Sequence, residues 1–246
     1  MKVLFVGDVH NHMYMFKDVE RLDNQYNFDR IIFLGDYVDD WMTNNDNSME
    51  TINEVIALKK SAPDKYTFIL GNHENSYLGF PCSGHDYIND NLLRLLLIQN
   101  IDVFDLYTTV ELAGKTFYCS HAGFTNDYLI NELQPENTKW EDNMWMLKND
   151  ILARLELLVP CSYLRGGKYP YSSFVWADMR ELMYQQDELF LPYQIVGHTP
   201  VSKIYHHTEH NADLYFLDTH STYRDGTPVG NKSYLVWNDD RFLEEM

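Results

Sequence analysis

Three aspartates lie close together in the stretch RIIFLGDYVDDW, which covers residues 30–41. An apolar run ends at Gly35, and Asp36, Asp39 and Asp40 follow within five residues. Carboxylates packed this closely repel one another, and the repulsion is costly in a partly dry cleft. The pattern therefore predicts a site that holds a cation.

Other apolar runs of the chain also end in a polar residue that can bind a metal. These residues are Asp8 and His10, Asn72 and His73, His121, and His198. In open α/β sheets, ligands collect beyond the carboxyl ends of parallel strands, so we expect these side chains to meet. With His73 set aside, two carboxylates (one of them Asp36), one amide oxygen and three imidazoles form a mixed set of nitrogen and oxygen ligands. Such a set suits Mn, Fe or Zn better than Ca.

The segments that carry these residues are predicted to alternate between strand and helix. Short runs rich in β-branched and aromatic residues predict strands at 2–10, 30–38 and 66–74. Helices are expected at about 13–26, 48–61 and 86–99. This order predicts parallel strands joined by right-handed crossovers.

The second half of the chain continues with strands but also carries a long segment of another kind. Strands are predicted at 116–123, 194–201, 213–220 and 233–239. The segment at about 123–193 is rich in Met, Trp and Tyr, and its stretches 151–158 and 180–186 look helical. We expect a mostly helical insertion over the mouth of the site, within a single domain of residues 1–246.

Composition excludes several classes of protein. The formal net charge of −18 argues against a surface that binds nucleic-acid backbone. No apolar run is long enough for a signal sequence or a membrane span. The three cysteines contain no CxxC pair, so we expect reduced thiols and a cytoplasmic protein. Nothing in the sequence indicates an oligomeric state.

The motifs GDVH, GDYVDD, GNHE, SHAG and VGHTP, in that order, resemble those of the calcineurin-like metallophosphoesterase family. GDYVD followed by METINEVIALKKSAPDKYTFILGNHE is similar to its phosphoprotein-phosphatase branch, which includes bacterial and phage serine/threonine phosphatases and diadenosine tetraphosphatases. The resemblance implies an α/β fold, a four-layer αββα sandwich of two mixed β-sheets flanked by helices. It also implies two metals bridged by a carboxylate and a solvent hydroxide that attacks the phosphorus in line.

The resemblance also assigns a role to each matching residue. The two metals, divalent or trivalent ions of Mn, Fe or Zn, would share Asp36. The implied ligand groups are Asp8, His10 and Asp36 for one metal, and Asp36, Asn72, His121 and His198 for the other. His73 would protonate the leaving alkoxide, and Asp39 would orient His73 and favour its charged form.

One position departs from the family pattern. Where the family carries an arginine that clamps a phosphate oxygen, this chain has Asp40. Asp40 can point into solvent, receive a cationic part of the substrate or bind an extra ion. Replacement cations for the phosphate are sought at Arg165, Lys168 and Arg180, and His220 is a candidate for the rim of the site.

Three functions remain open from the sequence. The leading hypothesis is a metal-dependent hydrolase of phosphomonoesters, acting on a phosphoprotein or a small molecule. The second is a phosphodiesterase or a dinucleoside polyphosphate hydrolase, favoured by the loss of the arginine at position 40. The third is a binding scaffold with a dead site, which the complete set of ligand positions and His73 argues against.

Overall fold

Two β-sheets packed face to face form the centre of the molecule. The computed structural model describes residues 1–43, 45–79, 90–134, 138–148 and 150–246. In the first sheet the strand order is β11-β10-β1-β2-β3-β4, and in the second it is β5-β6-β7-β9-β8. The strands are β1 (Lys2–Val6), β2 (Arg30–Phe33), β3 (Tyr66–Ile69), β4 (Phe104–Asp105), β5 (Tyr107–Leu112), β6 (Lys115–Ser120), β7 (Tyr193–Val196), β8 (Tyr205–His207), β9 (Asp213–Phe216), β10 (Tyr234–Asn238) and β11 (Arg241–Glu245).

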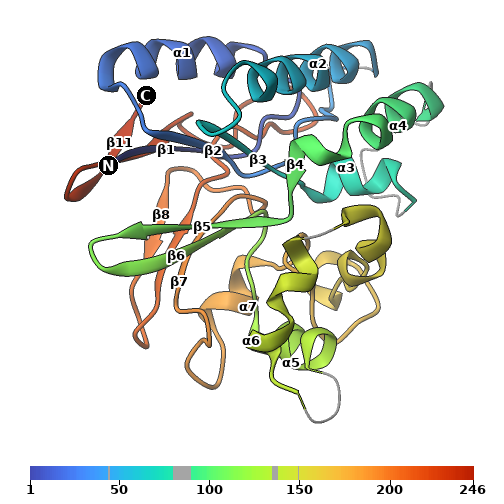
Figure 1. Ribbon diagram of the computed structural model, residues 1–246, viewed down its shortest axis with the longest axis vertical. Coiled ribbons are helices and arrows are strands. Elements are labelled where there is room, and N and C mark those ends of the chain that lie inside the picture. The colour runs from blue at the N-terminus through green and yellow to red at the C-terminus, as the bar shows by residue number, and fades with distance from the viewer. Residues whose placement is uncertain (44, 80–89, 135–137, 149) are drawn as a thin grey trace.

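Helices cover the outer faces of both sheets. Figure 1 shows α1 and α2 above the first sheet, and α5, α6 and α7 on the opposite side of the molecule. The α-helices are α1 (Tyr14–Tyr26), α2 (Asn45–Ser61), α3 (Asn72–Tyr77), α4 (Asp90–Gln99), α5 (Asn126–Leu133), α6 (Trp140–Asn143) and α7 (Met179–Met183). The 3₁₀ helices are η1 (Ile101–Val103), η2 (Met144–Lys148), η3 (Ile151–Leu158) and η4 (Tyr163–Arg165).

Side chains alternate between the two faces of strand β1, and this alternation builds two layers of core. Leu4 and Val6 pack on the outer side, in the cluster that includes helix residues such as Val19. Val3 and Phe5 pack between the sheets. All four β1 side chains are fully buried, as expected for a strand covered on both faces.

Each sheet is mixed, with parallel strands at the positions that carry the polar residues. In the first sheet β1 pairs parallel with β2, β2 with β3, and β3 with β4, while β10 and β11 are antiparallel. In the second sheet β6, β7 and β9 are parallel, and β5 and β8 pair antiparallel at the edges. The predicted four-layer α/β fold is therefore confirmed.

Several local predictions need correction. Residues 151–158 are helical, as predicted, and form a 3₁₀ helix, whereas α7 ends at Met183, before the predicted end at 186. Of the helix predicted at 86–99, residues 86–89 lie outside the described residues and α4 begins at Asp90. Strands β4, β5, β8 and β11 were not predicted. No helix in the described part of the chain is long and apolar enough to cross a membrane.

Candidate active site

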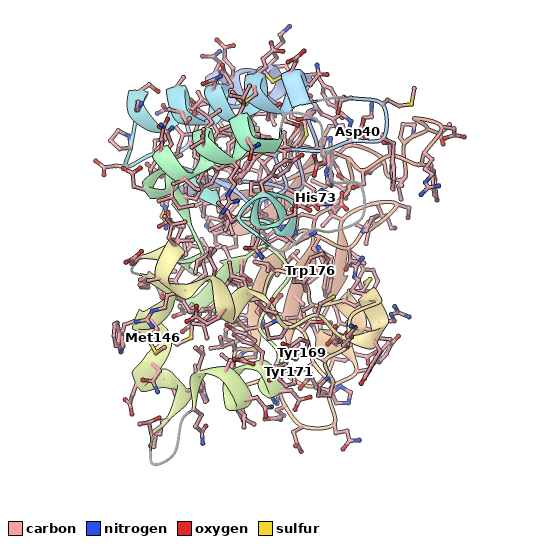
Figure 2. The ribbon with its side chains drawn as sticks, turned by 90° about the vertical axis from the view of Figure 1, so that its right-hand side faces the viewer. Asp40, His73, Met146, Tyr169, Tyr171 and Trp176 are labelled. Carbon is pink, nitrogen blue, oxygen red and sulfur yellow. The ribbon has the colours of Figure 1, made fainter. Side chains whose placement is uncertain are left out.

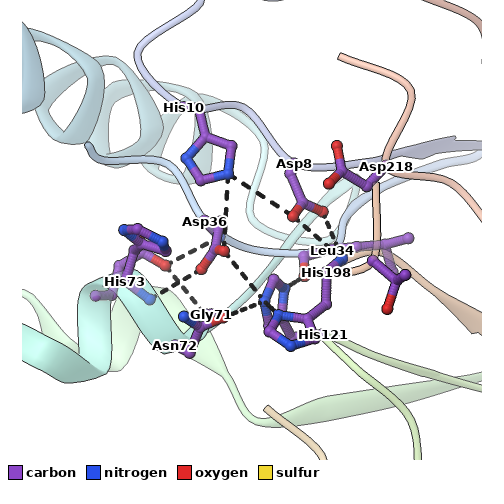
Figure 3. A network of polar contacts seen from close by, with 12 residues as sticks. Asp8, His10, Leu34, Asp36, Gly71, Asn72, His73, His121, His198 and Asp218 are labelled. Atoms are coloured by element: carbon purple, nitrogen blue, oxygen red, sulfur yellow. Dashed lines mark hydrogen bonds and ion pairs between the residues drawn. The ribbon is translucent and has the colours of Figure 1, made fainter. Parts of the chain in front are cut away.

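The predicted ligands come together at the carboxyl ends of five strands. Asp8 and His10 follow β1, Asp36 follows β2, and Asn72 and His73 begin α3 after β3. His121 follows β6 and His198 follows β7, so the second sheet contributes as well. Figure 3 shows these side chains converging around Asp36.

The first candidate ligand group surrounds His10. Its Nε2 lies 3.9 Å from Oδ2 of Asp8 and 3.9 Å from Oδ2 of Asp36. The other ring nitrogen, Nδ1, lies 2.7 Å from the backbone carbonyl of Asp39 and therefore carries the proton. The Nε2 lone pair is left facing the two carboxylates, an arrangement that a cation between them stabilises.

The second candidate group surrounds His121. Its Nδ1 donates to the carbonyl of Leu34 at 2.8 Å, which leaves the lone pair on Nε2. Three other atoms lie near that nitrogen: Asn72 Oδ1 at 2.9 Å, Asp36 Oδ2 at 3.2 Å and His198 Nδ1 at 3.1 Å. With its proton on Nδ1, His121 can only accept a hydrogen bond at Nε2, and the two oxygens are acceptors as well. At most the contact with His198 Nδ1 can therefore be a hydrogen bond. A metal ion would satisfy all of them.

Two further observations fit bound metals. Burial, and after it the nearby Arg165 guanidinium, lowers the pKa of His198 well below its usual value, so the imidazole is neutral, as a ligand must be. Burial, with the charges of Asp218 and Asp36, raises the pKa of Asp8 well above its usual value, and a metal cation beside these carboxylates would offset that effect.

Asp36 belongs to both groups of potential ligands. Metal-binding atoms of His10, Asp36 and His73 cluster within 4.8 Å, and so do those of Asp36, His121 and His198. The first cluster contains His73 where the resemblance implies Asp8. His73 N also donates to Asp36 Oδ1 at 2.9 Å, which holds one carboxylate oxygen in place.

Two glycines of the motifs make room for these carboxylates. A Cβ atom on Gly71 would lie 2.1 Å from Asp36 Oδ1, and one on Gly197 would lie 2.1 Å from Asp8 Oδ1. Both distances are far below contact distance, so a side chain at either position would displace the carboxylate. This close approach explains the glycine in GNH and in VGH.

His73 is held by a buried carboxylate. Its Nδ1 lies 2.9 Å from Asp39 Oδ2, and the Tyr77 hydroxyl donates to Asp39 Oδ1 at 2.5 Å. Asp39 is 5% exposed, so the interaction is little weakened by solvent. The ring orientation and the protonated state of Nδ1 are thereby set, which is the arrangement expected for a general acid.

Glu74 is a site residue that sequence reasoning missed. Its carboxylate is fully buried and accepts the backbone N–H groups of Gly71, Asp36, Tyr37 and Val38 at 2.7–3.1 Å. It therefore fixes the loop that bears Asp36 to the start of α3, which bears His73. The glutamate that ends the GNHE motif was the sequence feature that could have identified this residue.

Asp218 was also missed as a site residue. It follows β9, is 1% exposed and lies at the cavity beside Asp8 (Figure 3). Ser221 donates to it through its hydroxyl at 2.8 Å and its backbone N–H at 3.2 Å. Its place directly after the apolar run of the predicted strand 213–220 was the available signal.

A cavity of about 270 Å³ opens above the cluster. Figure 2 shows His73 between Asp40 and Trp176 in projection. The insertion contributes Arg165 and Trp176 to the walls, as expected for a segment over the mouth. The lining residues are His10, Asp36, Asp39, Asp40, Trp41, Asn72, His73, Arg165, Trp176, His198, Pro200, Asp218, Ser221 and Thr222.

Arg165 is the one Lys or Arg of the described residues that lines this cavity. Its Nη2 donates to Thr199 Oγ1 at 2.6 Å and lies 3.5 Å from the carbonyl oxygen of His198. Its Nε lies 3.2 Å from Asp178 Oδ2. These contacts hold the guanidinium at the edge of the cluster of candidate ligands.

Asp40 does not point into solvent, so that interpretation is wrong. Its side chain is 8% exposed and lines the cavity. Thr222 Oγ1 donates to Asp40 Oδ1 at 2.7 Å, and His12 Nε2 lies 3.8 Å from Oδ2. Burial lowers the pKa of His12 to about 4, so this imidazole does not neutralise Asp40.

Three predicted substrate-binding residues do not reach the cavity. Lys168 is exposed elsewhere on the insertion, and Arg180 is exposed and paired with Asp178 at 2.7 Å. His220 is fully buried, against the expectation that it lies at the rim, and its Nδ1 lies 3.1 Å from the hydroxyl of Tyr14. Burial lowers the pKa of His220 to about 3, consistent with a core histidine.

Comparisons with known proteins agree with this geometry. One curated relative is a putative serine/threonine-protein phosphatase of Schizosaccharomyces pombe, 29% identical over 128 residues. Another is a protein phosphatase 2A catalytic chain of Dictyostelium discoideum, 30% identical over 129 residues. Each match covers 50% of this chain, and 39% and 38% of those relatives, so the chain spans well under half of their length.

Solved structures share the fold at low sequence identity. A cold-active protein-tyrosine phosphatase of a psychrophilic Shewanella species superposes with a TM-score of 0.61 at 12% identity, over 99% of this chain and 77% of that one. A protein serine/threonine phosphatase of Saccharomyces cerevisiae gives 0.56 at 14% identity, over 100% and 79%. The family model described as calcineurin-like phosphoesterase matches residues 1–221. The chain therefore belongs to the calcineurin-like phosphoesterase family.

Proposed function

We propose that this chain hydrolyses phosphomonoesters, of a phosphoprotein or a small molecule, with the help of two transition-metal ions. One observation carries the proposal above the others. Asp36 belongs to both candidate ligand groups, and His73 with its Asp39 partner lies beside it at the cavity. The names of the two curated relatives, both protein phosphatases, support the choice of a monoester.

The metals would be held by the six residues predicted from the sequence. When bound, ions of Mn, Fe or Zn supply Lewis acidity toward the phosphoryl oxygens and lower the pKa of coordinated water. Asp36 would be shared between the two positions. His10 and His121 each present Nε2 because a backbone carbonyl faces Nδ1. Glu74 holds the loops that bring these ligands together.

The residues around the metals account for the remaining chemical needs. His73 would donate a proton to the leaving alkoxide, and Asp39 would stabilise the charged imidazole from which that proton comes. Arg165 would contact a phosphoryl oxygen from the side of the insertion, in place of the arginine that Asp40 replaces. No step requires a covalent intermediate with the protein.

A second candidate is a phosphodiesterase or dinucleoside polyphosphate hydrolase. It is favoured by one observation, the buried carboxylate of Asp40 at the cavity, because a singly charged diester would be repelled less than a monoester dianion. A phosphorylated substrate is the partner we propose. A cytoplasmic location and a lack of binding to nucleic-acid backbone remain predictions from composition.

The experiment is to strip the metals and restore Mn, Fe, Zn, Ni or Mg one at a time. Each form is assayed on a nitrophenyl phosphate monoester, the corresponding diester, a phosphopeptide and diadenosine tetraphosphate. We expect Mn, Fe or Zn to restore activity, with a monoester hydrolysed fastest. Asp36→Asn protein, treated in the same way, is the control for activity of free metal ions.

Two results would count against the proposal. If no metal restores hydrolysis of any phosphoester in folded protein, the chain is not a phosphoesterase. If the diester or the dinucleotide is hydrolysed faster than both monoesters, the second candidate function replaces the first.

A further inference from the structure

One wall of the cavity consists of Asp40 and Trp41, and we call it the Asp40 wall. Both residues follow the loop that carries Asp36, and both line the cavity. The Asp40 side chain is 8% exposed, whereas Trp41 is 46% exposed. A substrate bound at the metals would therefore reach a carboxylate first and an open indole ring next to it.

The Asp40 carboxylate has an unused acceptor. Oδ1 accepts from the hydroxyl of Thr222 at 2.7 Å. Oδ2 accepts no hydrogen bond within the described residues, and His12 Nε2, at 3.8 Å, is beyond hydrogen-bond distance. A carboxylate oxygen that lines a cavity and accepts no hydrogen bond from the described residues can accept one from a ligand. The strongest such donors are cationic.

Trp41 is already used to bind a cation. The guanidinium carbon of Arg224 lies 4.9 Å from the centre of the Trp41 ring, within the range of a cation–π interaction. Nearly half of the Trp41 side chain nevertheless remains exposed. A carboxylate and an indole side by side are complementary to an ammonium or guanidinium group. They are poorly suited to a second phosphate.

The charge of the whole chain points the same way. At a net charge of −18, the protein attracts cationic ligands from solution and repels anionic ones. Arg165 is the single Lys or Arg of the described residues that lines the cavity, and it lies on the insertion beside His198. Among the described residues no Lys or Arg forms an ion pair with Asp40, although Arg224 brings a cation to the Trp41 ring of the same wall.

We propose that the Asp40 wall selects phosphoesters whose leaving group carries a positive charge next to the phosphate, namely phosphopeptides with a basic residue beside the phosphorylated one. This inference rests on the proposed function and narrows its substrate class. Nucleotides are disfavoured by the same reasoning, because their further phosphates would bring negative charge to Asp40.

The test compares three phosphoserine peptides that differ at the residue after phosphoserine: arginine, its neutral analogue citrulline, or glutamate. For metal-loaded wild type, we expect kcat/KM to be about tenfold higher with arginine than with citrulline, and lower still with glutamate. Asp40→Asn should bring the arginine-to-citrulline ratio close to one. Trp41→Leu should lower it about threefold. Asp240→Asn removes the same charge from a turn outside the cavity and should leave the ratio unchanged.

A binding measurement separates this inference from the proposed function. Non-hydrolysable phosphonate versions of the three peptides are titrated into the same variants by calorimetry. If the chain proves to hydrolyse no phosphoester, the proposed function fails, yet a tenfold preference for the arginine peptide that Asp40→Asn abolishes would still uphold the Asp40 wall. The inference is overturned by any of three results. These are an unchanged ratio in Asp40→Asn, a dinucleotide preferred over every peptide, and a third metal ion per chain that Asp40→Asn removes.

Discussion

Asp39 joins His73 to Tyr77: one carboxylate oxygen lies 2.9 Å from His73 Nδ1, and the other accepts the Tyr77 hydroxyl at 2.5 Å. The His73 ring therefore cannot turn without breaking a buried charge-assisted contact. The arrangement suits the general acid proposed here, because it holds the ring in one orientation beside a carboxylate.

Replacing His73 by Asn tests this role. We expect turnover to fall about 100- to 1,000-fold for alkyl phosphates, whose leaving groups need a proton, and much less for nitrophenyl phosphate. Metal content, measured by elemental analysis, should stay the same. Equal losses on both substrates would argue that His73 positions the substrate instead of protonating it.

Replacing Asp36 by Asn should remove bound metal together with activity. Asp36 is the residue shared by both ligand groups, and the amide of Asn lacks the charge that offsets two cations. Wild type should carry about two ions per chain, and chelation should lower its melting temperature because bound metal stabilises only the folded state. Asp36→Asn protein that keeps two ions would contradict the shared-ligand arrangement.

Asp40→Arg should exchange repulsion of the phosphate for attraction. The side chain is largely buried at the cavity, so solvent screens its charge only weakly. The repulsion energy of a like-charge pair a few Å apart is then on the order of a few kcal/mol. We expect a lower KM for monoester dianions, and a smaller decrease for singly charged diesters. The ratio of the two is the decisive quantity, since general damage depresses both. An unchanged ratio in metal-loaded protein would remove Asp40 from substrate recognition.

Arg165 and Arg180 form a matched pair, because both contact the carboxylate of Asp178. Arg165 lines the cavity, whereas Arg180 is exposed and lies outside it. Arg165→Met should raise KM for phosphomonoesters about tenfold, and Arg165→Lys should recover part of the loss. Arg180→Met removes the same charge and should leave KM near the wild-type value. Equal effects of the two Met variants would indicate that the loss arises from Asp178.

The burial of Cys119 predicts how the stability of the fold changes at high pH. Burial between the sheets raises the pKa of its thiol to about 12, above the ordinary value of 9.0 that the unfolded chain takes. Above pH 9 the unfolded state loses this proton while the folded state keeps it, so the free energy of unfolding should fall as pH rises. Denaturant titrations at pH 8, 9 and 10 should show a smaller decline in Cys119→Val than in wild type. Alkylation of native Cys119 below pH 9 would contradict its burial.

The sequence predicted which polar side chains meet because these residues follow directly after strands. Asp8, Asp36, Asn72, His121 and His198 each follow an apolar run, and parallel pairing brings such ends together. Strands β4 and β8 have two and three residues, too short for their pattern to stand out from loop sequence. The kind of helix at 151–158 could not be predicted either, since its apolar residues suit a 3₁₀ helix as well as an α-helix.

Contacts between distant segments were the part that the sequence could not supply. Nothing in the sequence distinguishes Arg165 from Lys168 and Arg180. Only tertiary packing shows that Arg165 faces the cavity. The same holds for Asp40, because the hydroxyl that contacts it comes from Thr222, 182 positions away.

The long insertion joins two strands that are already neighbours. β6 and β7 pair directly and in parallel, with Cys119 beside Ile195, so they need a crossover connection between them, but the pairing does not fix the length or composition of that connection. The segment begins after His121 and ends before His198, and it can therefore be lengthened, shortened or exchanged during evolution while these candidate ligands keep their places. Since it supplies Arg165 and Trp176 to the cavity, a change of substrate can be inherited separately from the hydrolytic chemistry.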